Sequence, residues 1–366
     1  MKKINTVQLC SMFIILILSA TFGKGFSTVI KASGIDSWIS VLIAGVLGFG
    51  ILFIFIYISN YEKDLTLTEK TKKLFGNTFG TIINYILVII LFVTAVSLFY
   101  DLMGFISSQF LPETPIFIIG FMFTLVIIYI NIKGIETISR TALVIFFISM
   151  FLFIIAVFGL IGKFDVSNLK PMLEFGLKNS VKGSMYILLL NILPSVVLLI
   201  IPKNTLVDYK KTSICIIISY IFSIILILLT IFLTLGNLGI ELSRLYLFPE
   251  YVVLKRINLF NFIDRIENII VIQWIFGLFL NVSFIIYFIT NTIKKNNNKI
   301  ITYLIAFILL FISNYVFKNT TIYDVYIYNI AIYFKYTLLL VLILITIKIK
   351  YNRIKKKIWF LFFSVV

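Results

Sequence analysis

Long apolar stretches, separated by short polar clusters, fill almost the whole chain. A stretch of about 18 or more apolar residues is long enough for a helix to cross a bilayer. Ten such stretches are predicted, at residues 6–31, 37–59, 79–106, 115–132, 139–162, 181–202, 212–235, 266–290, 299–317 and 326–348. Because lipid offers the backbone no hydrogen bonds, only helices or closed barrels span it, and these stretches are too long for barrel strands. The pattern therefore predicts an all-α membrane protein with about ten transmembrane helices.

Composition agrees with this fold class and argues against an enzyme. Of the 366 residues, 61% are apolar and 13% are charged, too few charges for the surface of a soluble domain of this size. The chain has no histidine, which removes the commonest general base and metal ligand. No Ser-His-Asp set, phosphate-binding loop or pair of catalytic carboxylates is present. We expect no catalytic residues, no cofactor and no metal site, and Cys10 and Cys215 at predicted cytoplasmic helix ends predict no structural disulfide.

The net charge of +17 is expected to mark the cytoplasmic face rather than a nucleic-acid site, since no DNA- or RNA-binding motif is present. With the N-terminus inside, the predicted inner segments hold 20 of the 32 Lys and Arg residues but only 5 of the 15 Asp and Glu residues. This bias predicts that both termini are cytoplasmic and that the number of spans is even. A cleaved signal peptide ending near Ala20 would leave nine spans. We favour an uncleaved first span, because the apolar pattern resumes after Gly25 without a clean small-x-small site.

Three shorter segments complete the predicted organisation. Thr66 and Glu69 have the spacing of a capping box and Gly76 follows, so a short helix on the inner membrane surface is expected between them. Residues 1–350 are assigned to the membrane domain. Residues 351–366 are assigned to a tail that is first basic and then apolar, too short to span and expected at the interface. The long outer segment, about 236–265, is expected to pack as a cap.

Two spans contain residues that interrupt helices. Span one contains Gly23-Lys24-Gly25, and span six contains Pro194, which lacks a backbone donor and clashes with the preceding turn. Spans one and six are five apart, so they occupy equivalent places in a five-plus-five arrangement. Paired interruptions of this kind point to a transporter binding site, where freed backbone groups bind an ion or zwitterion. The alternatives are simple kinks without a ligand, and a first span that ends at Gly23 with Lys24 at the outer interface.

At these residues the chain resembles the B subunit of spore nutrient-germinant receptors. These are spore germination permeases of the amino acid–polyamine–organocation superfamily, which share the leucine-transporter fold. The resemblance covers nearly the whole chain, and its motifs are specific only as an ordered set. They are Gln8, Gly23-x-Gly25, Asp36-x-Trp38, Leu111-Pro112-Glu113-Thr114-Pro115, Gly134-Ile135-Glu136 with Ser139-Arg140, Lys170-Pro171 with Gly176, Phe248-Pro249, and Phe262-x-x-Arg265-x-Glu267 with Trp274.

The resemblance implies a leucine-transporter-like five-plus-five inverted repeat with broken helices one and six. It implies a germinant sensor in the spore inner membrane that works with a second membrane subunit and a lipoprotein, and whose pocket resembles an amino acid transporter site lined by spans one, three, six and eight. The positions that match this pocket are Gly23 and Gly25, Thr94 or Ala95, the stretch from Asn191 through Pro194 to Ser195, and Asn281.

Departures from the family pattern bear on the ligand. Pro194 and Val196 stand nearest to positions where the family commonly has glycine and an acidic residue. Lys24 replaces a small residue, and Asp101 takes the place of a basic residue late in span three. The loss of an acid near the span-six break and the gain of Lys24 favour an anionic or carboxylate-bearing ligand by charge complementarity.

The other polar residues have gating or structural interpretations. Glu136 and Arg140 are four apart and face each other on a helix, either as an inner gate or, the reading we prefer, as an interfacial ion pair. Arg265 and Glu267 are expected to anchor the outer loop to span eight. The functional alternatives are a sensory receptor subunit, an amino acid transporter that needs a titratable group in the membrane, and a conduit for water or small solutes.

Overall fold

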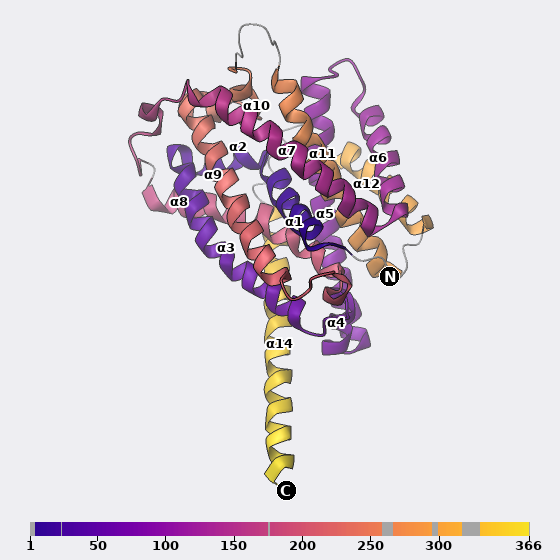
Figure 1. Cartoon of the computed structure of the whole chain (residues 1–366). Helices are drawn as coiled ribbons and strands as arrows, with labels where there is room; N and C mark the ends of the chain where they lie inside the picture. The colour runs from indigo at the N-terminus through magenta and orange to yellow at the C-terminus, as the bar shows by residue number, and fades with distance from the viewer. Residues whose placement is uncertain are drawn as a thin grey trace.

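The structure is a computed structural model that describes residues 4–22, 24–174, 176–257, 266–294, 299–316 and 330–365, and in this part of the chain it is a bundle of helices (Figure 1). The elements in chain order are α1 (Thr6–Thr21), α2 (Lys24–Ser33), η1 (Gly34–Asp36), α3 (Ser37–Asn60), α4 (Leu67–Phe75), α5 (Asn77–Gln109), α6 (Ile116–Lys133), α7 (Ile135–Ile161), η2 (Val166–Leu169), α8 (Gly176–Tyr186), η3 (Ile187–Ile192), η4 (Leu193–Ile200), η5 (Lys203–Thr205), α9 (Thr212–Leu245), α10 (Pro249–Leu254), α11 (Ile266–Ile293), α12 (Lys299–Val316) and α14 (Ile332–Val365).

The predicted membrane-protein architecture is confirmed. Within the described ranges, eight helical segments are long and apolar enough to cross a membrane, and two shorter apolar helices, Thr6–Thr21 and Lys299–Tyr315, coincide with the first and ninth predicted stretches. Where it is described, each predicted stretch falls mostly on helical backbone, with Phe22 and a few residues at stretch ends as exceptions. The chain is therefore an integral membrane protein, while the inverted five-plus-five repeat stays a prediction.

The short helix predicted after span two is present as α4. The Glu69 amide donates to Thr66 Oγ1 at 3.3 Å, and the Thr66 amide donates to Glu69 Oε2 at 2.9 Å, so both halves of the capping box form. The helix ends at Gly76, whose φ of 81° is a conformation that residues with a Cβ rarely adopt. The turn signals in the sequence therefore fix this element locally.

The last helix runs on through the segment that the sequence assigns to a tail. α14 continues without a break from Ile332 to Val365, and Figure 1 shows it projecting beyond the bundle at the end where α4 lies. The division of the chain at residue 350 is therefore not marked by a change in backbone. The placement of the tail at a membrane surface stays a prediction.

Burial separates central helices from outer ones. In the most apolar 18-residue window of the span Gly176–Ile200, 89% of the residues are buried. In the corresponding window of α7, 22% are buried. α1 is also buried over most of its length, and it packs against α7, α9, α11 and η3. Spans one and six are thus the centre of the bundle, with α11 beside them and α5 packed on α11.

The segment after α9 covers one end of the bundle. Gly239, with a φ of 73°, interrupts the helical backbone of α9, and α10 then packs against α9, α11, α7 and α2 (Figure 1). Gly239 allows this change of direction because it has no side chain to oppose a positive φ. The predicted cap is a packed element as far as Ile257, and the rest of that segment to residue 265 lies outside the described residues.

Candidate functional site

The first interruption lies between α1 and α2. α1 ends at Thr21, Phe22 has an extended backbone with φ −65° and ψ 148°, and α2 begins at Lys24. The Phe22 amide still donates to Leu18 O at 3.0 Å, so the helix closes normally before it stops. Gly23 itself lies outside the described residues. The interruption expected in span one is present at the expected place.

Side chains of α11 donate to α1 near its end, and one of them reaches a carbonyl that the helix leaves open. The last carbonyls of a helix have no partner within it. The Trp274 indole donates to Ser19 O at 3.2 Å, and the Asn281 amide donates to Leu16 O and to Ser19 Oγ, both at 3.1 Å. Asn281 therefore lies against α1, and it does not line the cavity described below.

The second interruption is a change of helix type in span six. The α8 backbone widens into a π-helical turn at η3 and then tightens into the 3-10 helix η4, which has Pro194 at its start. Proline lacks an N–H and cannot continue the regular ladder, and π turns of this kind recur at functional sites. Asn191, inside the π turn, is only 2% exposed.

The two interruptions lie side by side. A Cβ added to Gly25 would lie 2.5 Å from Ala20 O and 3.5 Å from Asn191 Oδ1, and α2 packs along α8 and η3. Only a residue without a side chain fits at position 25, because the nearest atom is a backbone carbonyl that cannot rotate away. The glycine thus allows the start of α2, the end of α1 and the π turn to meet.

A cavity lies at this meeting point. Its lining comes from the α1–α2 junction, α5, η3 and the start of α14: Ala20, Lys24, Gly25, Thr28, Thr94, Ser97, Leu98, Asp101, Leu190, Asn191, Ala331 and Lys335. About 40 Å³ is open to the centres of water-sized molecules, enough for a few waters. The cavity is therefore small in this conformation, and a larger ligand would require its walls to move apart.

Charged groups are concentrated in this cavity. Lys24 Nζ lies 3.9 Å from Asp101 Oδ1 and 5.0 Å from the centre of the Tyr100 ring. Lys335 Nζ donates to Thr94 Oγ1. Lys24, Asp101 and Lys335 are all less than 10% exposed. Ionised groups are costly in such surroundings and usually mark a functional site in a membrane protein.

The predicted site residues divide into three groups. Lys24, Gly25, Thr94 and Asn191 line the cavity together. Ala95, Pro194 and Ser195 are buried close by in sequence without lining it, and Asn281 supports α1. Gly23 and Arg265 lie outside the described residues.

Two charged residues of the cavity were not predicted as site residues. The sequence marked Asp101 only as a departure from the family pattern late in span three, and Lys335 only as a residue within the tenth predicted stretch, 326–348. Asp101 follows Thr94 by seven residues, which places both on one face of α5 with Ser97. Lys335 is a lysine within an otherwise apolar stretch, which is itself a sign of function. Each signal could have marked its own residue from the sequence, although not the meeting of the two in one cavity.

The predicted gating residues lie elsewhere. Glu136 and Arg140 form the expected ion pair one turn apart on α7, and Glu136 also lines a larger cavity with Lys133, Pro202 and Tyr287. Glu267, in the first turn of α11, is buried. The ion pair is therefore present, while a role in gating stays a prediction.

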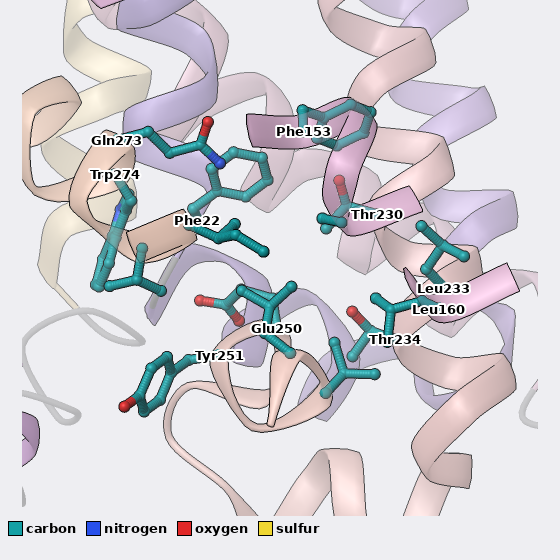
Figure 2. A pocket seen from close by; sticks show the side chains of 15 residues that line it. Phe22, Phe153, Leu160, Thr230, Leu233, Thr234, Glu250, Tyr251, Gln273 and Trp274 are labelled. Carbon is teal, nitrogen blue, oxygen red and sulfur yellow. The ribbon is translucent and has the colours of Figure 1, made fainter. Parts of the chain in front are cut away.

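A further, mainly apolar cavity lies beneath α10. Figure 2 shows Phe22, Phe153 and Trp274 around it, with Glu250 and Gln273 among the lining side chains. Phe22, the residue at the α1–α2 interruption, is part of its wall. A movement of this interruption would therefore alter the space under α10 as well.

Comparison with known proteins places the chain in a family. Residues 3–322 match the profile of the family described as "Spore germination protein". Spore germination protein A2 of Bacillus subtilis (strain 168) is 28% identical over 300 residues, which cover 80% of each chain. Spore germination protein KB of the same organism is 24% identical over 304 residues, again 80% of each chain, and spore germination protein XB of Bacillus anthracis is 23% identical over 285 residues, 75% of this chain and 77% of that one. The profile match spans well over half of the sequence, and the chain therefore belongs to the spore germination protein family.

Proposed function

We propose that this chain is the nutrient-sensing membrane subunit of a spore germinant receptor. A small nutrient, of which an amino acid is the expected class, would bind in the cavity between the two interrupted helices. The proposed location is the spore inner membrane, with a second membrane subunit and a lipoprotein as partners. The single observation that supports the site most strongly is the juxtaposition of Gly25, Asn191 and Lys24 around one small cavity.

The cavity offers a physical route from binding to a signal. Its walls come from four segments that are distant in sequence, so a ligand too large for the cavity at its present size would bind only a wider arrangement of them. A ligand shifts a conformational equilibrium by its difference in affinity for the two states. Opening around a nutrient would displace α2 and η3 relative to α5, and this displacement would be passed to the partner subunits.

The first test is a germination assay with variants of the cavity. In spores whose own copy of the gene is deleted, Gly25→Ala should raise the nutrient concentration for half-maximal germination about tenfold or more, because the new methyl group meets Ala20 O. Asn191→Leu should act similarly by removing the amide. Gly104→Ala is the matched control, since a Cβ at Gly104 meets nothing within 4 Å.

Two controls make this assay decisive. The amount of each variant in spore membranes, measured by immunoblot, separates a binding defect from loss of the protein. Normal nutrient responses in both cavity variants at wild-type abundance would contradict the proposed site. If deletion of the gene changed no nutrient response at all, the sensory role would be wrong.

Transport of a solute is a second candidate, and one observation favours it. Proton-coupled transport needs titratable groups within the membrane domain, and the structure adds Asp101 and Lys335 to the predicted Lys24. Uptake of a radiolabelled nutrient into proteoliposomes distinguishes the two. Accumulation that depends on a proton gradient would favour a transporter, and binding without accumulation would favour a receptor.

A further inference from the structure

The two cysteines of the chain, Cys10 and Cys215, are neighbours in the folded protein although they are far apart in sequence. The Cys10 thiol on α1 forms side-chain hydrogen bonds with Cys215 and Ser219 on α9. Cys215 and Ser219 are four residues apart, which is one helical turn, so Cys10 lies against one face of α9. Both cysteines are free thiols, and each is partly exposed.

The backbone before each helix explains why the thiols meet. Ile4 and Leu206 form a parallel bridge, and the Val207 amide donates to Ile4 O at 3.1 Å. Helices α1 and α9 begin shortly after this bridge and pack along each other. Cys10 is the fifth residue of α1 and Cys215 is the fourth of α9, so both lie about one turn from the start of their helix. The contact therefore joins two packed helices.

Adjacent thiols have a defined reaction with hydroperoxides. One thiolate attacks the O–O bond of the hydroperoxide, which breaks to give a sulfenic acid on the cysteine and an alkoxide that leaves as the alcohol. The second thiolate then attacks the sulfenic sulfur, forms the S–S bond and releases hydroxide. The two thiol protons end on these leaving groups, so two thiols and one hydroperoxide give one disulfide, one alcohol and one water.

We infer that Cys10 and Cys215 are a redox modification site, which a hydroperoxide converts into a disulfide between α1 and α9 and a small thiol reduces again. The free thiols of the structure agree with the expectation that no structural disulfide holds the fold, because this bond forms only on oxidation. The reaction needs no ligand in the central cavity, so it does not depend on the proposed function.

The disulfide would restrain the helix that leads to the central cavity. α1 is continuous from Thr6 to Thr21, and Ala20 lines that cavity. A covalent bond at Cys10 would tie α1 to α9 about 15 Å before Ala20, at 1.5 Å per residue of helix. Oxidation should therefore oppose widening of the cavity around a nutrient. This consequence, unlike the disulfide itself, rests on the proposed function.

The test counts free thiols on the purified full-length chain. The protein is treated with tert-butyl hydroperoxide at a dose that oxidises free glutathione, then denatured, alkylated with N-ethylmaleimide and measured by intact mass spectrometry. Because the chain has two cysteines, the untreated protein should carry two maleimide adducts. The oxidised monomer should carry none and should regain both after dithiothreitol. A digest without reductant should contain one peptide pair, joined between Cys10 and Cys215.

A shifted cysteine is the matched control. Ile214 precedes Cys215 on α9 but is 61% exposed. In the variant Cys215→Ser/Ile214→Cys the second thiol therefore lies at the same depth on an exposed face, and it should form no intramolecular bond with Cys10. An equal yield of that bond in this variant would overturn the inference. Two adducts on the oxidised wild type, or sulfinic acids or intermolecular dimers in place of the intramolecular bond, would also overturn it.

Spores test the consequence for nutrient sensing. Hydroperoxide should raise the nutrient concentration for half-maximal germination about fivefold or more in wild-type spores. Cys10→Ser spores, which should respond normally without oxidant, should show no such shift. Equal shifts in both strains would reject the restraint on α1. If deletion of the gene changed no nutrient response, the proposed function would be wrong, and the mass spectrometry would still decide whether the disulfide forms.

Discussion

At the scale of single residues, the buried lysines do different things. Lys24 and Lys335 line a cavity, whereas Lys70 on α4 donates hydrogen bonds to backbone carbonyls. Lys70 is 2% exposed, and its ammonium group donates to Ile58 O at 2.9 Å and to Ser59 O at 3.3 Å, at the end of α3. The last carbonyls of α3 thus gain a cationic donor, which complements the negative end of the helix dipole. Lys70 therefore attaches the short helix α4 to the end of span two.

This position of Lys70 predicts a pH dependence. Burial is the main cause that lowers its pKa from 10.5 to about 8, and the charge of Lys203 lowers it further. Between about pH 8 and 10.5 the unfolded chain would hold a proton that the folded chain has lost. Stability should therefore rise with pH through this window, on the order of 1–3 kcal/mol for this group.

The measurement is the thermal midpoint in detergent from pH 7 to 10.5, for the wild type and for Lys70→Met. The difference between the two curves isolates Lys70 from the other groups that titrate in this range. The wild type should gain stability relative to the variant above about pH 8. A constant difference over the whole range would show that Lys70 does not change its protonation on unfolding in this window.

At the scale of elements, one tyrosine joins α9 to α3. Tyr220 is 1% exposed, and its hydroxyl donates to Ala44 O at 3.1 Å and to Gly45 O at 2.9 Å. Gly48 leaves room for it, since a Cβ there would lie 2.0 Å from the hydroxyl oxygen and 2.9 Å from the adjacent ring carbon. The small residue and the tyrosine thus form one contact between two spans.

This contact predicts a coupled pair of substitutions. Tyr220→Phe should lower the free energy of unfolding by about 1 kcal/mol through loss of the hydrogen bonds. Gly48→Ala should lower it by about 1–3 kcal/mol, because the methyl group overlaps the hydroxyl. The double variant should lose less free energy of unfolding than the two single variants lose together. Phe at position 220 lacks the hydroxyl oxygen that the new methyl group at position 48 would overlap. Thermal unfolding is measured for the wild type, the two single variants and the double variant. Strictly additive losses of stability would contradict this packing.

The sequence predicted elements well wherever the signal was local. The capping box at Thr66 and the apolar length of each span depend on neighbouring residues, so α4 and the spans could be placed in advance. The interruption at Pro194 was equally local, but the π turn before it was not predicted, since nothing in Ile187–Ile192 specifies a wide turn.

The site was harder to predict because its parts meet only in the folded bundle. Asp101 and Lys335 are 234 positions apart in the numbering, and only packing of α14 near α5 brings them to the same cavity. Asn281 shows the opposite case. Its match to the family pocket suggested a ligand contact. Its side chain instead donates to Leu16 O and Ser19 Oγ of α1, and no sequence pattern shows that these acceptors lie within its reach.

At the scale of the whole molecule, the most buried spans are those that surround the polar cavity. The spans with the most buried windows, Gly176–Ile200, α11 and α5, are those that contact or surround the interruption in span one. The outer helices present large apolar side chains on their exposed faces, such as Phe147, Phe151 and Phe158 on α7. A membrane protein of this kind keeps its polar groups inside and its apolar surface towards lipid, so the polar centre is where a ligand would bind.

The two ends of the bundle differ in charge, which predicts its orientation. α4 and the projecting part of α14 lie at one end and α10 at the other (Figure 1). The end with α4 and α14 carries the exposed lysines Lys72 and Lys350, among others, and the positive-inside tendency predicts that it is cytoplasmic. Both chain termini would then lie inside the cell.

Cysteine labelling in intact cells tests this orientation. In a background with Cys10→Ser and Cys215→Ser, single substitutions Glu241→Cys, Lys72→Cys and Lys350→Cys are placed at exposed positions. A membrane-impermeant maleimide should label position 241 in intact cells and positions 72 and 350 only after permeabilisation. Labelling of 72 and 350 on opposite sides would mean an odd number of spans between them. The reverse pattern at all three positions would invert the molecule, and α10 would then cover its cytoplasmic end.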